Sequence, residues 1–550
     1  QRFDIGFRQP NRTLNHPGPN EGRCAERSAL AVEIHIHVVI EVFTCFELSP
    51  PSCVAVMMPY SATLILACVA AAFLARAIFI ALHSPLNRIP GPWIAKFSNI
   101  RLKLAVISGR RIHYIDALHK KYGPFVRISP DEIAVNDSKA IKQIHGIGSG
   151  FEKSSWYDTM VAMERPTLFT MTDGKSHAAR RKLLARGFSK SNIRQNWEGV
   201  MRQKVVLAVD KIRDEAARNG GMVDVLKWWT FMASDVSSHL ILGEDFHTLE
   251  RGEVNDYMRI LTKALRGAGI GAELPLLRSI GQRLPFQFTQ KLWNTNEFLD
   301  DYAKVAVRNM QQSGQSKNVF ANISAEAEKG DIGTLDLRDV ELEASALFVA
   351  GTDTTAVSLS YVIYAVLARP DLRRRLEAEV AELPDNFQDA DLEKLPLLHA
   401  VIEETLRLYG AAPGMLPRVV PAGGFDMGDY YIPQGTTVTT HAYSIHRDPA
   451  IFPDPLEFKP SRFLPESEDK LSDAAKAVYM PFGAGSRTCL GLHIAYGELR
   501  LATAEFFRRC PGSRLAESTT EDVMEFENFF LIAPRGHKCE VVIDSKTFWA

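Results

Sequence analysis

Residues 482–491 read Phe482-Gly-Ala-Gly485-Ser-Arg487-Thr-Cys489-Leu-Gly491 and open the amphipathic run LGLHIAYGELRLATAEFFRR. Glycines let a backbone pass close to a flat ligand, and Arg487 supplies a positive charge for an acidic group of that ligand. Cys489 lies at the N-terminus of the expected helix, where partial positive charge and nearby amide donors favour the thiolate over the thiol. An axial cysteine on haem iron needs these features.

This segment resembles the haem loop of the cytochrome P-450 family, whose pattern is F-x-x-G-x-R-x-C-x-G. All fixed positions match, and at average residue usage a chance match in such a chain is expected on the order of 10⁻⁴ times. The resemblance implies the P-450 fold, a mainly α domain with small β sheets. It also implies that Cys489 ligates the iron of haem b and that Phe482, Gly485, Arg487 and Gly491 contribute to cofactor binding. Read alone, a single cysteine is more often a small buried hydrophobe.

A charged pair on one predicted helix extends the resemblance. In Glu404-Thr-Leu-Arg407, residues three apart place a carboxylate and a guanidinium on the same helix face. Such pairs alone are usually solvated surface contacts that contribute little. The P-450 family closes this pair with a second arginine, and Arg462 in KPSRF matches that partner. The resemblance therefore implies a buried structural triad of Glu404, Arg407 and Arg462 behind the haem.

The run AGTDTT at 350–355 lies within a helix expected over about 337–368. Small and polar residues are poor in the middle of a helix, so they either face a ligand or distort the helix. A tolerated polar face is the alternative interpretation. The resemblance implies that Asp353 and Thr354 are the catalytic acid–alcohol pair, which relays protons during oxygen activation, and that Gly351 leaves room for dioxygen.

Further basic residues match haem-binding positions of the family. A Trp-x-x-x-Arg helix usually binds a haem propionate there; in this chain His177 replaces the Trp and Arg181 keeps the cation. Arg418, after the Glu-x-x-Arg helix, resembles another propionate-binding arginine. The resemblance assigns His177, Arg181 and Arg418 to cofactor binding, and His446 to a structural role or a place near a propionate.

The composition is that of an ordinary globular protein. The chain has 550 residues, 46% hydrophobic and 23% charged, which excludes fibrous, collagenous and wholly disordered classes. With 64 Lys+Arg against 65 Asp+Glu the net charge is −1, so no global basic field favours nucleic acid as a partner. The cysteines are too few and too scattered for a disulfide framework, and a reducing compartment is expected.

A transmembrane anchor helix is predicted over 61–82, SATLILACVAAAFLARAIFIAL, whose single charge is Arg76. At about 1.5 Å per residue, this length roughly matches a hydrocarbon core of about 30 Å. The core of a signal peptide is the alternative, but no cleavage site follows, and the cations after the span favour a cytosolic body. The expected localisation is a single pass through the endoplasmic reticulum membrane, with the catalytic domain in the cytosol.

Three further parts complete the predicted organisation. Residues 1–56 contain no methionine and fit no domain, so they are expected to be unstructured, or upstream sequence wrongly included in a gene model. The proline-rich segment 85–93, PLNRIPGPW, forbids helix continuation and is expected to be a hinge. Residues 94–550 are expected to form the haem-thiolate domain. Apolar periodicity predicts helices within 110–123, 197–221, 339–370 and 397–410, and strands within 124–136 and 423–440.

Together the motifs imply a haem-thiolate monooxygenase that inserts one oxygen atom from O2 into an apolar small molecule. Electrons must come from NADPH through a separate NADPH-cytochrome reductase, a flavoprotein, because the chain has no flavin or NADPH module. Two alternatives remain: a haem-thiolate isomerase or dehydratase, which would not need the acid–alcohol pair, and a haem-binding protein without catalytic activity.

Other stretches, such as IPGPW and YGPFVRISPDEIAV, resemble filamentous-fungal members of the family that modify polyketides or terpenoids in secondary metabolism. By this resemblance, residues 346–354, 411–416 and 528–531 are expected to line the substrate pocket. A cationic surface for the reductase is predicted on the segment that carries Arg180, Lys182, Arg186 and Lys190.

Overall fold

The computed structural model describes residues 51–161, 163–243, 245–253, 267, 269–284, 304, 318–320 and 335–544. The chain divides into a first unit, residues 1–80, and a second unit, residues 81–550. The helix α2 (Pro51–His83) is continuous over the whole of the predicted span 61–82. It begins six residues inside the extension expected over 1–56, and residues 1–50 lie outside the described part.

The apolar side chains of α2 include exposed Leu64, Phe73 and Phe79. Its stretch Ala67–His83 is apolar but shorter than a full membrane span. Among the described helices, one is both long and apolar enough to cross a membrane, α17 (Leu337–Leu367), and most of its apolar stretch is buried. Burial of that kind is expected of a core helix in a globular domain.

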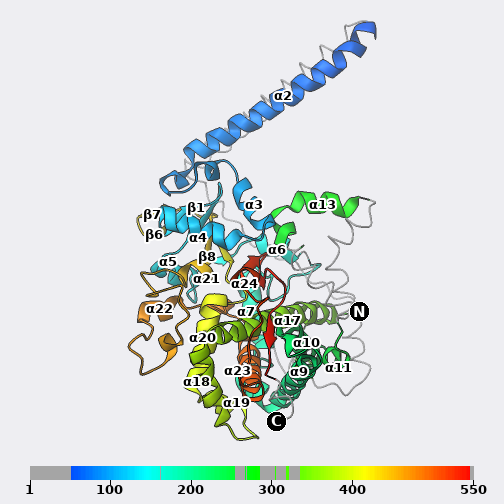
Figure 1. Cartoon of the computed structure of the whole chain (residues 1–550). Helices are drawn as coiled ribbons and strands as arrows, with labels where there is room; N and C mark the ends of the chain where they lie inside the picture. Colours follow the sequence, from blue (N-terminus) through cyan, green and yellow to red (C-terminus); the bar gives the residue numbers. More distant parts are fainter. Residues whose placement is uncertain are drawn as a thin grey trace, which may run out of the picture. The chain divides into compact units, whose positions relative to one another are not determined.

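Long helices around α17 form the core of the second unit (Figure 1). α17 contacts α10 (Val225–Ser237), α20 (Pro396–Tyr409) and α23 (Leu492–Arg509), and α9 (Glu198–Arg218) packs against both α10 and α23. α17 begins where the Asp336 side chain accepts from the amide of Asp339, and α20 begins with proline at its first position. The helices predicted within 197–221, 339–370 and 397–410 are thus present, and so is the one predicted within 110–123.

Shorter helices complete the described helical part. Their bounds are α3 (Ile100–Ile107), α4 (Arg111–Tyr122), α5 (Ser138–His145), α6 (Trp156–Val161), α7 (Gly174–Ala185), α8 (Lys190–Asn196), α11 (Thr248–Arg251), α13 (Pro275–Arg283), α18 (Pro370–Ala381), α19 (Asp389–Leu392), α21 (Ala442–Ile445), α22 (Asp473–Val478) and α24 (Glu521–Met524). Short 3₁₀ turns cover Pro85–Arg88, Trp93–Lys96, Pro460–Phe463 and Gly485–Arg487, and a π turn, Ser238–Leu242, ends α10. The helix α2 ends at His83, just before the predicted hinge at 85–93.

Small sheets lie beside the helices, as the sequence predicts. The largest has the order β1-β2-β8-β5-β3, in which β2 and β8 run parallel and the other neighbours run antiparallel. The remaining sheets are β4-β12-β9, β10-β11 and the hairpin β6-β7. The strand bounds are β1 (Phe125–Arg127), β2 (Glu132–Val135), β3 (Glu152–Lys153), β4 (Met222–Asp224), β5 (Met415–Val419), β6 (Phe425–Met427), β7 (Tyr430–Ile432), β8 (Thr437–His441), β9 (Arg514–Leu515), β10 (Phe526–Asn528), β11 (Ile532–Pro534) and β12 (Glu540–Val542).

Candidate active site

The loop over 482–491 is closed by its own backbone. The amide of Cys489 donates to the carbonyl of Phe482 at 2.9 Å. Gly485 has a φ of 65°, and a Cβ there would lie 1.9 Å from the carbonyl oxygen of His145. Only glycine fits this position, because it combines a left-handed backbone with close contact to a neighbouring chain segment.

The loop places Cys489 just before the beginning of α23. That helix starts at Leu492 with Gly491 as its N-cap, and the amide of Gly491 acts to lower the pKa of the Cys489 thiol. A Cβ at Gly491 would lie only 4.0 Å from the Cys489 sulfur. The partial positive charge of the helix start therefore acts on the sulfur over a short distance.

Cys489 differs from the other described cysteines of the body in its surroundings. Its side chain is exposed, whereas Cys510 and Cys539 are buried. The pKa of the Cys489 thiol is raised overall, because burial among protein atoms outweighs the Gly491 amide and the charge of Arg181, which both lower it. At Cys510, burial raises the pKa to about 12. Cys489 is thus the one of these three cysteines whose side chain is accessible.

A cluster of buried basic groups surrounds His177. Burial and the charges of Arg418 and Arg487 hold the pKa of Lys153 well below its usual value. Burial, Arg487 and Lys153 also lower the pKa of His177 to about 3, so its imidazole is neutral. Arg487 is fixed in this cluster by donating to the carbonyl of Met171 at 2.7 Å. The structure therefore brings together three of the predicted cofactor-binding residues, His177, Arg418 and Arg487.

This cluster fits the acidic groups of a haem. Among the described residues, neither Lys153 nor Arg418 has a carboxylate partner: Lys153 lies over the ring of Tyr157 at 4.0 Å, and Arg418 donates to the carbonyl of Pro417 at 3.0 Å. Buried cations without a counter-charge are costly. Haem propionates would supply the missing anions and the exposed Cys489 sulfur would supply the iron ligand, so the residues present fit this cofactor.

Lys153 is a candidate cofactor-binding residue that the sequence analysis missed. Its only signal in the sequence is a lysine between aromatic residues in the segment FEKSSWY at 151–157. Arg181, which the sequence analysis assigned to a propionate, donates from Nη1 to the carbonyl of Thr488 at 2.7 Å. It therefore contacts the cysteine loop, and its propionate contact stays a prediction.

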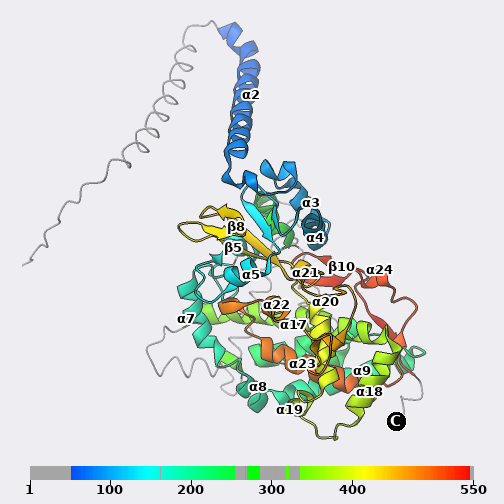
Figure 2. The same ribbon diagram turned by 90° about the vertical axis from the view of Figure 1, so that its left-hand side faces the viewer.

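The predicted acid–alcohol pair lies half-buried on α17. Burial raises the pKa of Asp353 to about 6, and the Thr354 hydroxyl donates to the carbonyl of Ala350 at 2.7 Å. The next residue, Thr355, donates to the buried carboxyl of Glu498 on α23 at 3.2 Å. This contact joins the helix that carries the pair to the helix that follows the cysteine loop, and Figure 2 shows the two helices crossing.

Gly351 lies where α17 packs against α10. α17 is continuous through this region, and the hydroxyls of Thr352, Thr354 and Ser358 each donate to the carbonyl four residues earlier. A Cβ on Gly351 would lie 2.5 Å from the hydroxyl oxygen of Ser237 on α10. Gly351 therefore lies in close contact with α10, and its expected role in leaving room for dioxygen stays a prediction.

The three residues of the predicted triad meet in the protein interior. Arg407 donates to both carboxylate oxygens of Glu404, at 2.7 and 2.8 Å, and Arg462 donates to the same carboxylate at 3.3 Å. Arg407 also donates to the carbonyl of His446 at 2.6 Å, and the amide of Met480 donates to the His446 ring at 3.1 Å. His446 therefore ties the triad to the chain just before the cysteine loop.

Two of the predicted pocket segments lie together in the structure. The amide of Ile532 donates to the carbonyl of Ala411 at 2.9 Å, which joins the end of segment 528–531 to the start of segment 411–416. In the third segment, Ala350 is exposed although it lies in the middle of the core helix α17.

The geometry agrees with a comparison to known families, in which the model named Cytochrome P-450 matches residues 90–541. The chain belongs to the cytochrome P-450 family. It is 39% identical over 499 residues to the cytochrome P-450 monooxygenase cypX of Dothistroma septosporum, covering 88% of this chain and 96% of that relative. It is 41% identical over 461 residues to the monooxygenase tazI of Aspergillus terreus, covering 83% and 93%.

A third relative has a name that states its reaction. The chain is 33% identical over 402 residues to the methylphloroacetophenone oxidase of Cladonia uncialis, covering 69% of this chain and 86% of that relative. Membership of the P-450 family implies haem held by a cysteine thiolate, and the named monooxygenase relatives establish an oxidoreductase that incorporates oxygen. The fold expectation, mainly α with small sheets, is confirmed.

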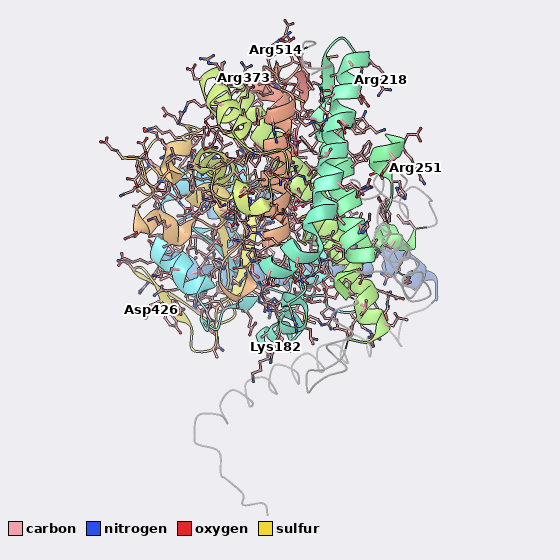
Figure 3. All side chains as sticks on the ribbon, turned by 90° about the horizontal axis from the view of Figure 1, so that it is seen from below. Lys182, Arg218, Arg251, Arg373, Asp426 and Arg514 are labelled. Atoms are coloured by element: carbon pink, nitrogen blue, oxygen red, sulfur yellow. The ribbon has the colours of Figure 1, made fainter. Side chains whose placement is uncertain are left out.

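The cationic surface predicted for a reductase needs a correction. Arg180 is not available on it, because its guanidinium donates to Glu343 at 2.9 Å and lies 3.5 Å from Asp339. Lys190 pairs with Glu393 at 2.7 Å. Lys182 and Arg186 remain exposed at the end of α7, and the side chain of Lys182 points away from the body in Figure 3.

Proposed function

We propose that this P-450 hydroxylates an apolar small molecule, with electrons delivered from NADPH by a separate NADPH-cytochrome reductase. One oxygen atom of O2 enters a C–H bond as hydroxyl, and the other leaves as water after two electrons and two protons are supplied. Thiolate-bound haem, when present, supplies the oxidising chemistry, because the thiolate donates electron density that favours O–O cleavage. The protein binds and orients the substrate and delivers protons to the oxygen.

Each part of the chain has a separate task in this proposal. Cys489 holds the iron, and the basic cluster around His177 holds the propionates. Asp353 has a pKa of about 6 because of burial, so it gains and loses a proton near neutral pH. Thr354, one residue further along α17, offers a hydroxyl through which that proton can pass. This pair favours a monooxygenase over an isomerase or dehydratase, which needs no proton delivery to oxygen.

The exposed side chain of Cys489, just before the start of α23, is the observation that carries this proposal. Its test is the carbon monoxide difference spectrum and NADPH consumption with added reductase, for the wild type, Cys489→Ala and Cys510→Ala. We expect Cys489→Ala to lose the thiolate-type band and all turnover. Cys510→Ala should retain both, because that thiol is buried away from the cluster.

Other outcomes of the same measurement separate the alternatives. A thiolate-type band in Cys489→Ala would refute the ligand assignment. A normal wild-type band together with conversion of hydroperoxides and no NADPH use would identify an isomerase or dehydratase. A normal band without turnover of any supplied compound would identify a haem-binding protein without activity.

The proposed substrate is an apolar polyketide or terpenoid of secondary metabolism. Support comes from the aromatic walls near the predicted pocket segment 528–531, where Phe530 packs against Trp156 at 6.0 Å and Phe169 at 5.7 Å between ring centres. The relative named methylphloroacetophenone oxidase acts, by its name, on an aromatic ketone. Product analysis after feeding aromatic and terpenoid scaffolds to reductase-supplemented enzyme would decide between the two classes.

We also propose attachment to the endoplasmic reticulum membrane through α2, with the catalytic domain in the cytosol. The apolar segment 61–82 supports this, as do the cations that follow it in the sequence. Removal of residues 1–83 should shift the protein from the membrane fraction to the soluble fraction. Recovery of the shortened protein wholly in the soluble fraction, alongside a membrane-bound full chain, would support the anchor; a soluble full chain would refute it.

A further inference from the structure

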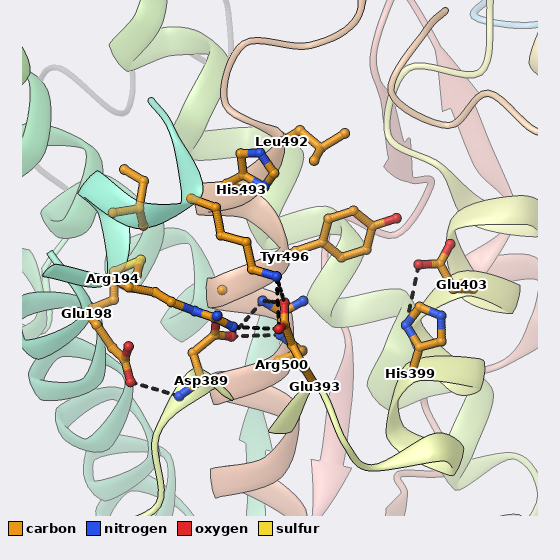
Figure 4. Close-up of a pocket in the computed structure, with 14 residues that line it drawn as sticks. Arg194, Glu198, Asp389, Glu393, His399, Glu403, Leu492, His493, Tyr496 and Arg500 are labelled. Atoms are coloured by element: carbon orange, nitrogen blue, oxygen red, sulfur yellow. Dashed lines mark hydrogen bonds and ion pairs between the residues drawn. The ribbon is translucent and has the colours of Figure 1, made fainter. Parts of the chain in front are cut away.

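Glu403 is a buried carboxylate next to the triad residue Glu404, yet it takes no part in the triad. It lies on α20 and is only 5% exposed. The phenol of Tyr479 donates to its carboxylate at 2.7 Å and to its backbone carbonyl at 2.9 Å. The phenol of Tyr496 points toward the same carboxylate in Figure 4, and the charge of Glu403 contributes to raising its pKa. One carboxylate thus accepts from one phenol and has a second phenol beside it.

The two tyrosines stand on either side of the cysteine loop. Tyr479 is three residues before Phe482, and Tyr496 is seven residues after Cys489, on the first turns of α23. The Tyr496 ring packs on the Phe482 ring with 5.1 Å between centres. Phe482 in turn accepts the hydrogen bond from the amide of Cys489. Glu403 therefore reaches the entry and the exit of the loop at the same time.

Electrostatics keep both phenols as donors. Burial and the nearby charge of Glu403 raise the pKa of Tyr479 and of Tyr496 well above the usual value for tyrosine. Both hydroxyls therefore stay protonated at any working pH; that of Tyr479 donates to the carboxylate, and that of Tyr496 is available to do so. Hydrogen bonds to an ionised acceptor are stronger than those between neutral groups.

One further residue, His399, contacts the carboxylate of Glu403 on the side that faces solvent. The ring of His399, one helical turn earlier, lies 3.7 Å from the carboxylate, and its side chain is half exposed. Both residues, with Tyr496, line a cavity of about 440 Å³ beside α23 (Figure 4). Tyr479 does not line this cavity, whereas the contact with His399 is open to solvent, so the hydrogen bond from Tyr479 is the stronger contact.

We propose that Glu403 is a positioning residue that clamps the cysteine loop through Tyr479 and Tyr496, and so holds Cys489 in place as the iron ligand. This inference rests on the proposed haem-thiolate function. Glu404 and its arginines fix α20 against the segment around Arg462, while Glu403 fixes the same helix against the loop. Loss of the clamp should leave the fold and haem binding largely intact but let the thiolate ligand be lost more readily.

The test compares Glu403→Leu, Tyr496→Phe and Tyr479→Phe with the wild type, all as full-length, haem-loaded protein. The measurement is the rate at which the thiolate-type carbon monoxide band converts to the non-thiolate form at mild denaturant. Losing a hydrogen bond to a charged acceptor should speed conversion about tenfold or more in Glu403→Leu. Tyr496→Phe keeps the ring packing on Phe482 but removes the hydroxyl that faces Glu403, so it should show part of this effect.

A matched control removes another buried phenol. The Tyr361 hydroxyl donates to the carbonyl of Met524 at 3.0 Å, away from the cysteine loop. Tyr361→Phe should lower thermal stability to a similar degree as Tyr496→Phe, yet leave the conversion rate of the carbon monoxide band near the wild-type rate. Equal conversion rates in Tyr361→Phe and Tyr496→Phe would show that the tyrosines stabilise the fold generally, and would overturn the proposal.

The double variant tests whether Glu403 and Tyr496 act as a unit. If they do, Glu403→Leu combined with Tyr496→Phe should convert no faster than Glu403→Leu alone. Additive effects would contradict the clamp. If Glu403→Leu yields no folded protein, the two phenylalanine variants decide the matter. A wild type without any thiolate-type band would instead refute the proposed function, so the two failures are distinguishable.

Discussion

At the scale of single residues, neighbouring threonines on α17 have different surroundings. Thr354 is half-buried and its hydroxyl bonds only to its own helix at Ala350, so it can exchange this bond for another partner. Thr355 is buried and donates to the carboxyl of Glu498, whose pKa burial raises to about 8. The two hydroxyls therefore have separate expected roles, a proton relay and a helix–helix contact.

Thr354→Ala should uncouple electron use from product formation. Without the hydroxyl, haem uptake and substrate binding should be nearly unchanged, but proton delivery should falter and reduced oxygen should leave as hydrogen peroxide. We expect product per NADPH to fall severalfold while peroxide rises. Thr355→Ala is the matched control and should affect stability more than coupling. Equal coupling in Thr354→Ala and wild type would remove this residue from the mechanism.

Asp353 should give coupling a dependence on pH. Burial raises its pKa to about 6, so the carboxyl is mainly protonated below that pH and mainly ionised above it. If it donates the proton, product per NADPH should fall as the pH rises through about 6. Asp353→Asn cannot titrate, so its coupling should be low and flat across the same range. A wild-type profile that matches the flat profile of Asp353→Asn would exclude Asp353 as the donor.

At the scale of elements, α20 carries two adjacent acids with different partners. Glu404 faces Arg407 and Arg462, whereas Glu403 faces the tyrosines that flank the cysteine loop. Because neighbouring residues on a helix point about 100° apart, a single helix can brace two different segments. This arrangement places α20 between the segment around Arg462 and the haem loop.

Breaking the triad should prevent accumulation of haem-loaded protein. Glu404→Ala would leave two buried guanidiniums without their carboxylate, and loss of one partner in a buried ion pair costs roughly 3–5 kcal/mol. We expect little haem-containing protein from Glu404→Ala or Arg407→Ala, measured as haem per folded protein. A solvent-exposed pair offers a control: Asp371→Ala, which removes the partner of Arg374, should be neutral. Normal haem content in either triad variant would contradict a structural role.

At the scale of the whole molecule, the face of α7 is the proposed contact for the reductase. Reversing the exposed Lys182 to Glu should slow electron transfer severalfold at low salt, and the wild-type rate should fall as salt rises, because rim charges act mainly on association. Arg218→Glu on α9 is the control, since this exposed cation lies far from Lys182 in Figure 3. Equal electron-transfer rates in Lys182→Glu and Arg218→Glu would show that the reductase binds at a different surface.

Much of the protein was predictable from the sequence, because the deciding patterns are local. The cysteine loop places its glycines, Arg487 and Cys489 within ten residues, so their spacing alone identifies the family. Helices such as α9 and α20 follow from apolar residues repeated every three or four positions. The start of α23 just after Gly491 follows in the same way.

The rest depended on partners far away in the chain. From the sequence, Arg180 is expected to be a surface cation. In the fold it donates to Glu343, which lies 163 residues further along the chain. Lys153 becomes a candidate for the cofactor only because tertiary packing buries it beside Arg418, without a carboxylate. Glu403 gains its role when two tyrosines from either side of the cysteine loop reach it. Local sequence determined which helices and which loop form, but burial and the approach of distant charges arise only from packing, and these decided which polar residues serve the site.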